Sequence, residues 1–103
     1  MLANVNPAGC TLRSVWWIAI QPYRGAHFAT SPEKLAANCI KVGSPKRGVV
    51  LDPFAGSGTT LTVARALGRR SIGIELKPGY IELAARRCSG DILRLERLAE
   101  AVA

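Results

Sequence analysis

The stretch VVLDPFAGSGTTLTVARALGRRSIGIE, residues 49–75, decides the fold. A short apolar run ends at Asp52, a glycine turn follows, and residues 60–67 carry apolar side chains at helical spacing. Gly68 stands where glycine commonly ends a helix, and residues 71–75 form a second short apolar run that ends on an acid. We therefore expect strand, turn, helix and strand, the opening unit of a parallel sheet in an α/β fold.

Further elements are expected on both sides of this unit. "KPGY" opens a helix that runs to about Cys88, and the break at residues 89–90 precedes a last helix. Upstream, residues 14–20 are apolar and β-rich and predict one buried strand, and "TSPEKLAANCI" predicts a helix that begins near Pro32. The expected buried positions are Leu35, Ala36, Cys39 and Ile40 in that helix and Ile92, Leu95, Leu98 and Val102 in the last one.

This pattern divides the chain into a lead-in and one domain. Residues 1–13 are expected to be irregular. The domain at 14–103 would comprise a strand, loop and helix at 14–47, the strand–helix–strand–helix core at 48–88, and the terminal helix at 89–103.

Composition bounds the function. The chain has 103 residues, of which 49% are hydrophobic, and its 14 basic and 7 acidic residues give a net charge of +7. This favours a small folded protein with an anionic partner such as nucleic acid. Three widely spaced cysteines without a CxxC pair predict reduced thiols and no metal site. The longest apolar run is too short to span a bilayer, and the N-terminus lacks the pattern of a signal peptide, so we expect a cytoplasmic protein without a membrane partner.

The glycine turn is of a kind that binds nucleotides. A phosphate-binding loop needs a lysine where Thr59 stands, and this excludes that class. The dinucleotide fingerprint GxGxxG keeps two glycines but has Leu61 at the third position. Asp52 would repel a pyrophosphate but attract the ammonium and sulfonium of S-adenosylmethionine, and Glu75 is spaced to bind a ribose diol. The residues favour S-adenosylmethionine and leave open NAD or a turn that binds no ligand.

The same residues resemble the DNA amino-methyltransferases, which methylate adenine N6 or cytosine N4. Their cofactor motif DxFxGSGTT is matched by Asp52, Phe54 and residues 56–60, and their next motif is matched by Glu75 and Tyr80. "SVWWIAIQPY" and "AHFATSPEKLAANCI" are similar to the segment that precedes the cofactor motif in members with a circularly arranged motif order. The resemblance covers about residues 14–88. It implies a partial Rossmann-like S-adenosylmethionine-dependent methyltransferase fold, with an incomplete parallel sheet flanked by helices.

The resemblance also implies a cofactor site built from three segments. Glu75 would accept hydrogen bonds from the ribose hydroxyls, Asp52 with the turn at 54–59 would hold the methionine end, and Phe54 would wall the pocket. A loop with His27 would contact the cofactor from the opposite side. The expected cofactor-binding residues are His27, Phe28, Ala29, Thr30, Asp52, Phe54, Gly56, Ser57, Gly58, Thr59 and Glu75.

Some of these residues have simpler alternatives. His27 is alternatively a packed loop residue, and Tyr80 is expected to pack between helix and sheet rather than touch a ligand. Trp16 and Trp17 have the chemistry to stack a base, although an apolar strand would place at least one of them in the core.

The residues that hold the target base are not found in this sequence. In the family, a (Asp/Asn/Ser)-Pro-Pro-(Tyr/Phe) loop does this work, and "QPY" at residues 21–23 lacks the second proline and follows a different strand. We expect the cofactor-binding portion of a DNA methyltransferase, without catalytic residues of its own and inactive alone, with one open sheet edge beside residues 49–51. DNA is the expected partner of the complete enzyme. The missing motifs would lie on a separate chain of a split enzyme, or the sequence is a truncated product or a mis-started part of a longer reading frame; these three interpretations stay open. The alternatives are a non-catalytic remnant and another nucleotide-binding Rossmann-like module. The target base, the recognition sequence and the biological role stay open, with restriction–modification among the possible roles.

Overall fold

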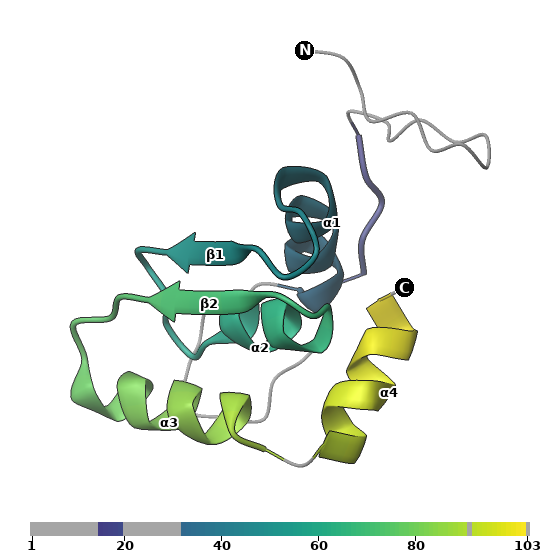
Figure 1. Cartoon of the computed structure of the whole chain (residues 1–103). Helices are drawn as coiled ribbons and strands as arrows, with labels where there is room; N and C mark the ends of the chain where they lie inside the picture. The colour runs from purple at the N-terminus through teal and green to yellow at the C-terminus, as the bar shows by residue number, and fades with distance from the viewer. Residues whose placement is uncertain (1–14, 20–31, 91, 103) are drawn as a thin grey trace.

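The computed structural model describes residues 15–19, 32–90 and 92–102, and six elements lie in this part of the chain (Figure 1). Their order is α1 (Glu33–Gly43), β1 (Val49–Asp52), α2 (Thr59–Ala66), β2 (Arg70–Gly73), α3 (Pro78–Cys88) and α4 (Ile92–Val102). The predicted α/β unit is thus confirmed, with α2 joining the two strands and α3 following them.

The strands form a two-stranded parallel sheet. Val49 pairs with Arg70 and Leu51 with Ile72, so these four side chains share one face because side chains alternate along a strand. Val50 points to the other face and packs against the core under the sheet. Figure 1 shows that α2 lies behind the strands, while no helix of the described segments covers the near face. Val49, Leu51 and Ile72 are accordingly 48%, 61% and 56% exposed.

The core lies among helices more than under the sheet. One cluster of buried side chains joins α1, α2 and α4, namely Ala36, Ala37, Ile40, Val63, Ala64, Leu98 and Val102. Val63 and Ala64 are fully buried at its centre. Leu95 of α4 is buried as well, so the apolar stripe of the last helix packs against its neighbours, as the sequence predicts.

Two expectations about the first part of the chain are wrong. Residues 15–19 do not form a strand. At least one of the two tryptophans was expected in the core, but Trp16 is only half-buried and Trp17 is 96% exposed. A strand needs a neighbour to satisfy its backbone groups, and the sheet of the described chain consists of β1 and β2 alone.

The second error concerns α1. Its buried residues are Ala36, Ala37 and Ile40, whereas Leu35 and Cys39 are exposed. Both side chains face a groove beside β1 rather than the core, because α1 packs on α2 and not on the sheet.

Candidate cofactor site

The turn after β1 forms the centre of the site. Asp52 ends β1, and its Oδ1 accepts a hydrogen bond from the backbone N–H of Phe54 at 3.0 Å, which starts the turn. Gly58 has a φ of +83°, and its N–H donates to the carbonyl of Ala55 at 2.9 Å. A Cβ at Gly58 would lie 2.7 Å from the Cβ of Ala84, so α3 approaches the turn as closely as a glycine permits.

Glu75 holds this turn from the second strand. β2 ends at Gly73, two residues before Glu75, so the predicted acid follows the strand rather than ending it. Its Oε2 accepts the N–H of Gly56 at 2.9 Å, and its Oε1 accepts the N–H groups of Leu76 and Lys77 at 2.9 and 3.0 Å. The carboxylate therefore joins the glycine turn to the start of α3 and is itself held in one orientation.

The two hydroxyl residues of the turn point inward. Ser57 and Thr59 are 3% and 6% exposed. Both hydroxyl oxygens accept hydrogen bonds from Nη1 of Arg87 in α3, at 2.8 and 3.2 Å. Any ligand contact from these two residues would therefore come from backbone atoms.

Arg87 is the residue that sequence reasoning missed. It lies in the last turn of α3, where a basic side chain is ordinary because it complements the helix dipole. Its partners in the turn are 28 and 30 residues away in the sequence, so no local spacing marks it.

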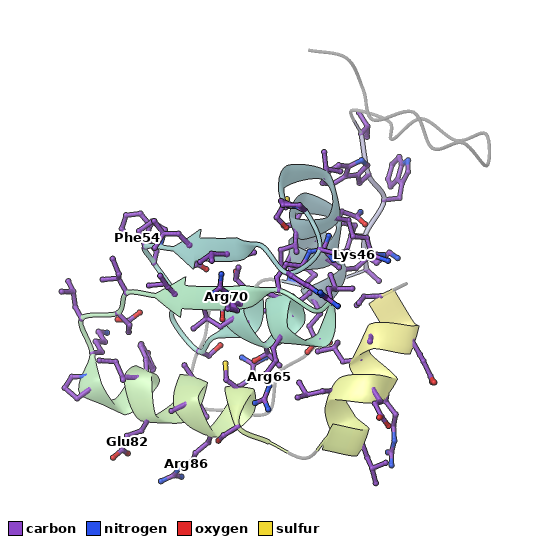
Figure 2. The ribbon with its side chains drawn as sticks, in the orientation of Figure 1. Lys46, Phe54, Arg65, Arg70, Glu82 and Arg86 are labelled. Carbon is purple, nitrogen blue, oxygen red and sulfur yellow. The ribbon has the colours of Figure 1, made fainter. Side chains whose placement is uncertain are left out.

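The rim of the site is apolar. Phe54 is 88% exposed at the carboxyl end of β1 (Figure 2), and Leu76, after β2, is 92% exposed. Tyr80 is half-buried, and Nζ of Lys77 lies 5.3 Å from its ring centroid, a cation–π contact. The structure thus brings Asp52, Phe54, the turn and Glu75 together, while residues 27–30 lie outside the described part.

The donor set suits S-adenosylmethionine better than a phosphate. Two carboxylates flank the turn, and a carboxylate attracts hydroxyl donors and cations but repels an anion. The two carboxylates and the turn lie beyond the carboxyl ends of the parallel strands. This is the place where open α/β sheets bind their ligands. The described residues hold no group of three or more acids, histidines or cysteines that would bind a metal ion.

A family model described as DNA methylase, of the N6/N4 type, matches residues 3–86. The chain belongs to the N6/N4 DNA methylase family. Among its relatives, the Type II methyltransferase M.Cfr9I of Citrobacter freundii is 42% identical over 86% of this chain and 30% of that protein. M.SmaI of Serratia marcescens is 49% identical over 73% of this chain and 26% of that protein.

Solved structures of this family share the fold. The M1.HpyAVI–SAM complex superposes with a TM-score of 0.68 and 32% identity, over 82% of this chain and 42% of that one. The cytosine-N4-specific PvuII DNA methyltransferase gives a TM-score of 0.60 and 30% identity, over 76% of this chain and 29% of that one. This N6/N4 methylase chain therefore spans less than half the length of these relatives.

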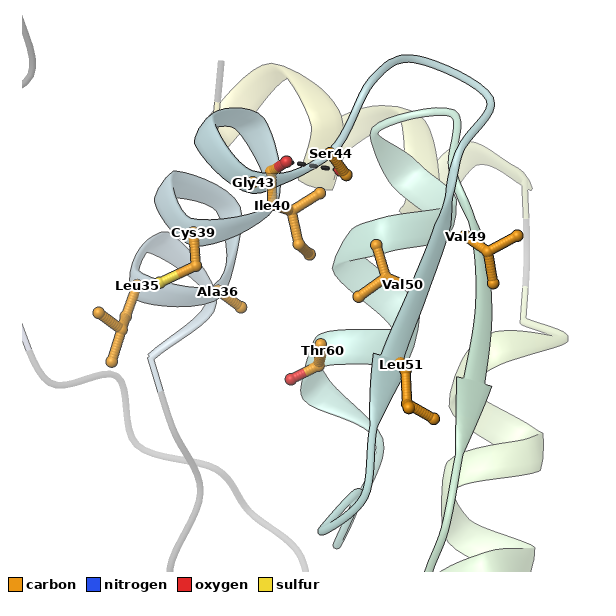
Figure 3. Close-up of a pocket in the computed structure, with 10 residues that line it drawn as sticks. All are labelled: Leu35, Ala36, Cys39, Ile40, Gly43, Ser44, Val49, Val50, Leu51 and Thr60. Carbon is orange, nitrogen blue, oxygen red and sulfur yellow. Dashed lines mark hydrogen bonds between the residues drawn. The ribbon is translucent and has the colours of Figure 1, made fainter. Parts of the chain in front are cut away.

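The outer edge of β1 is open in this methylase chain, as expected. No strand of the described residues pairs with it, and a groove of about 460 Å³ lies between it and α1 (Figure 3). We call this the β1 groove. It is mostly apolar, with Leu35, Cys39 and Ile40 on one side and Val49, Val50 and Leu51 on the other.

Two basic side chains, those of Lys46 and Arg70, lie away from the cofactor edge. In Figure 2, Lys46 and Arg70 lie near the amino ends of the strands, opposite Phe54. Among the described basic groups, burial lowers the pKa of Lys41, and the charges of Lys34 and Arg69 lower it further. The described segments contain no helix of the length and apolar character that crossing a membrane requires.

Proposed function

We propose that this chain is the S-adenosylmethionine-binding portion of a DNA methyltransferase that modifies an exocyclic amino group, adenine N6 or cytosine N4. The observation that carries the proposal is the Glu75 carboxylate, held against the glycine turn by the N–H of Gly56. Membership of the N6/N4 methylase family supports it.

The proposed roles follow from the geometry. The ribose hydroxyls would donate to Glu75, and the methionine ammonium would lie near Asp52 and the backbone of the turn. Phe54, exposed at the rim, would cover the cofactor and exclude water. The residues at 27–30 would contact it from the opposite side. When bound, S-adenosylmethionine supplies a methyl group on a positively charged sulfur, which a nearby amino nitrogen can attack.

We infer that the base-holding part comes from polypeptide that this chain does not contain, and that it joins at the β1 groove. The open edge of β1 offers unpaired backbone groups to a further parallel strand, and the apolar lining offers it a surface to bury. DNA would be the substrate of the completed enzyme, which would act in the cytoplasm. Its Type II relatives favour a role in restriction–modification.

Calorimetric titration of the purified chain tests the cofactor. We expect S-adenosylmethionine to bind more tightly than NAD. Asp52→Asn keeps the acceptor for the Phe54 N–H but removes the charge, so it should weaken S-adenosylmethionine binding. Glu75→Ala should abolish binding, whereas Glu82→Ala, at a side chain 76% exposed on α3, should leave it unchanged. Tighter binding of NAD, or full affinity in Glu75→Ala, would contradict the proposal.

Reconstitution tests the second part. We expect a neighbouring reading frame that encodes a (Asp/Asn/Ser)-Pro-Pro-(Tyr/Phe) loop, and co-expression of its product should give DNA methylation. Leu35→Asp in the β1 groove should prevent this, whereas Leu93→Asp, exposed on α4, should not. If no such frame exists, the chain is better described as a non-catalytic remnant. If the Leu35→Asp and Leu93→Asp variants behave alike, the joining surface lies elsewhere.

A further inference from the structure

The charged side chain of Arg87 lies inside the protein, behind the proposed cofactor site. The residue is 6% exposed in the last turn of α3. Its neighbour Arg86 has a side chain 80% exposed. A buried guanidinium loses its hydration, and this free-energy cost is recovered only if the surroundings provide well-placed acceptors.

The acceptors of Arg87 belong to the cofactor turn. Nη1 lies 2.9 Å from the carbonyl oxygen of Ser57, 2.8 Å from its hydroxyl and 3.2 Å from the hydroxyl of Thr59. The peptide between Ser57 and Gly58 is thereby fixed at both ends, because its N–H also donates to Ala55. The turn is thus held by Glu75 from one side and by Arg87 from the other.

The same guanidinium reaches a third element. Nη2 lies 3.9 Å from Oε1 of Glu33, the first residue of α1. Glu33 follows residues 27–30, the other proposed wall of the site, by only three positions in the sequence. One planar group therefore links the turn to the start of the helix that follows the second wall.

Stability alone does not explain a charge at this position. Well-packed apolar side chains often stabilise a protein as much as a buried ion pair does. A guanidinium adds what an apolar group lacks, a set of hydrogen-bond directions in one plane. We propose that Arg87 is a positioning residue of the cofactor site, whose guanidinium holds the backbone of residues 57–59 in the conformation that receives the methionine end of S-adenosylmethionine. This inference rests on the proposed function.

A pair of ligands separates positioning from folding. 5′-Methylthioadenosine keeps the adenine and the ribose diol but lacks the amino-acid end and the positive charge. In the full chain, Arg87→Met should weaken binding of S-adenosylmethionine by about tenfold or more, as expected when a charge-assisted hydrogen bond that organises a site is lost. Its affinity for 5′-methylthioadenosine should change by less than about twofold. Arg86→Met removes the same charge from the next residue and should change neither affinity.

The outcomes decide between the roles. Equal losses of affinity for both ligands in Arg87→Met would show that Arg87 acts only on folding. Unchanged affinities would show that it does not act on the site. Either result overturns this inference but leaves the proposed function standing. If the unmodified chain binds neither ligand, the proposed function fails and the inference fails with it. If Arg87→Met does not fold, Thr59→Val takes its place, since it removes one acceptor of Nη1 at nearly constant volume. Thr59→Val should weaken binding of S-adenosylmethionine more than binding of 5′-methylthioadenosine. Thr59→Ser, which retains the hydroxyl, should keep most of the affinity for S-adenosylmethionine. If Thr59→Ser binds no better than Thr59→Val, the inference is overturned.

Discussion

Replacing Gly58 by alanine places a methyl group where α3 already lies. The added Cβ would meet the Cβ of Ala84 at 2.7 Å and its Cα at 3.0 Å, and neither atom belongs to a flexible side chain. The φ of +83° at Gly58 adds a second cost, because an L-residue is strained in the left-handed region.

The expected loss follows from three contributions. Left-handed strain costs about 1–2 kcal/mol. Overpacking of a well-packed contact costs about 1–3 kcal/mol. The lower entropy of the unfolded chain returns about 0.4–1 kcal/mol. We expect Gly58→Ala to lower the free energy of unfolding by about 2–4 kcal/mol, a large part of the roughly 5 kcal/mol at the lower end of the range for natural domains.

Urea unfolding followed by circular dichroism measures this loss, and two other glycines supply the controls. Gly68 has a φ of +76° but open space around its Cβ position, so Gly68→Ala tests strain alone and should cost about 1 kcal/mol. Gly79, in the first turn of α3, has neither constraint, and Gly79→Ala should stabilise the chain by about 0.5–1 kcal/mol.

The order of the three variants is the decisive result. If Gly58→Ala cost no more than Gly68→Ala, the close approach of α3 to the turn would not exist in solution. If it cost nothing at all, the left-handed turn itself would be wrong.

Three further predictions concern the core, the pH dependence and the activity. Val63→Ala, at a fully buried position, should cost about 2 kcal/mol in urea unfolding, and a loss below half of that would contradict the packing of α2. The pKa of Lys41 in the folded chain lies below its ordinary value of 10.5. As the pH rises through the folded-state pKa, the unfolded chain binds more protons than the folded one, so the free energy of unfolding should increase with pH up to about 10.5. Lys41→Gln should flatten this increase in thermal melts. The chain alone should transfer no labelled methyl group to DNA, and robust incorporation would show that the base-holding residues are present after all.

The regular part of the fold could be predicted because its signals are local. Apolar spacing, Pro78 at the start of α3 and Gly68 after α2 each act within one or two turns of chain, and all five elements from β1 to α4 lie where these signals place them. The predicted strand at residues 14–20 depended instead on a neighbouring strand, which sequence cannot place. Leu35 and Cys39 were misjudged for a related reason: helical spacing shows which residues share a face, not what covers that face.

The sequence predicts which residues form the site, but not the long-range hydrogen bonds that hold them. Asp52, Gly56 and Glu75 meet because the carboxyl ends of parallel strands lie together. The inward direction of Ser57 and Thr59 depends on a guanidinium about 30 residues away, whose burial no pattern of apolar residues indicates.

The hydrogen bonds of the Glu75 carboxylate make ligand binding observable by hydrogen exchange. Its two oxygens accept hydrogen bonds from the amides of Gly56, in the turn after β1, and of Leu76 and Lys77, in the segment between β2 and α3. These amides exchange with solvent only when the carboxylate moves away. A ligand that fixes this carboxylate slows the exchange of all three by a common factor set by its concentration and affinity. Hydrogen exchange at these amides would thus detect occupancy of the site without any catalytic turnover.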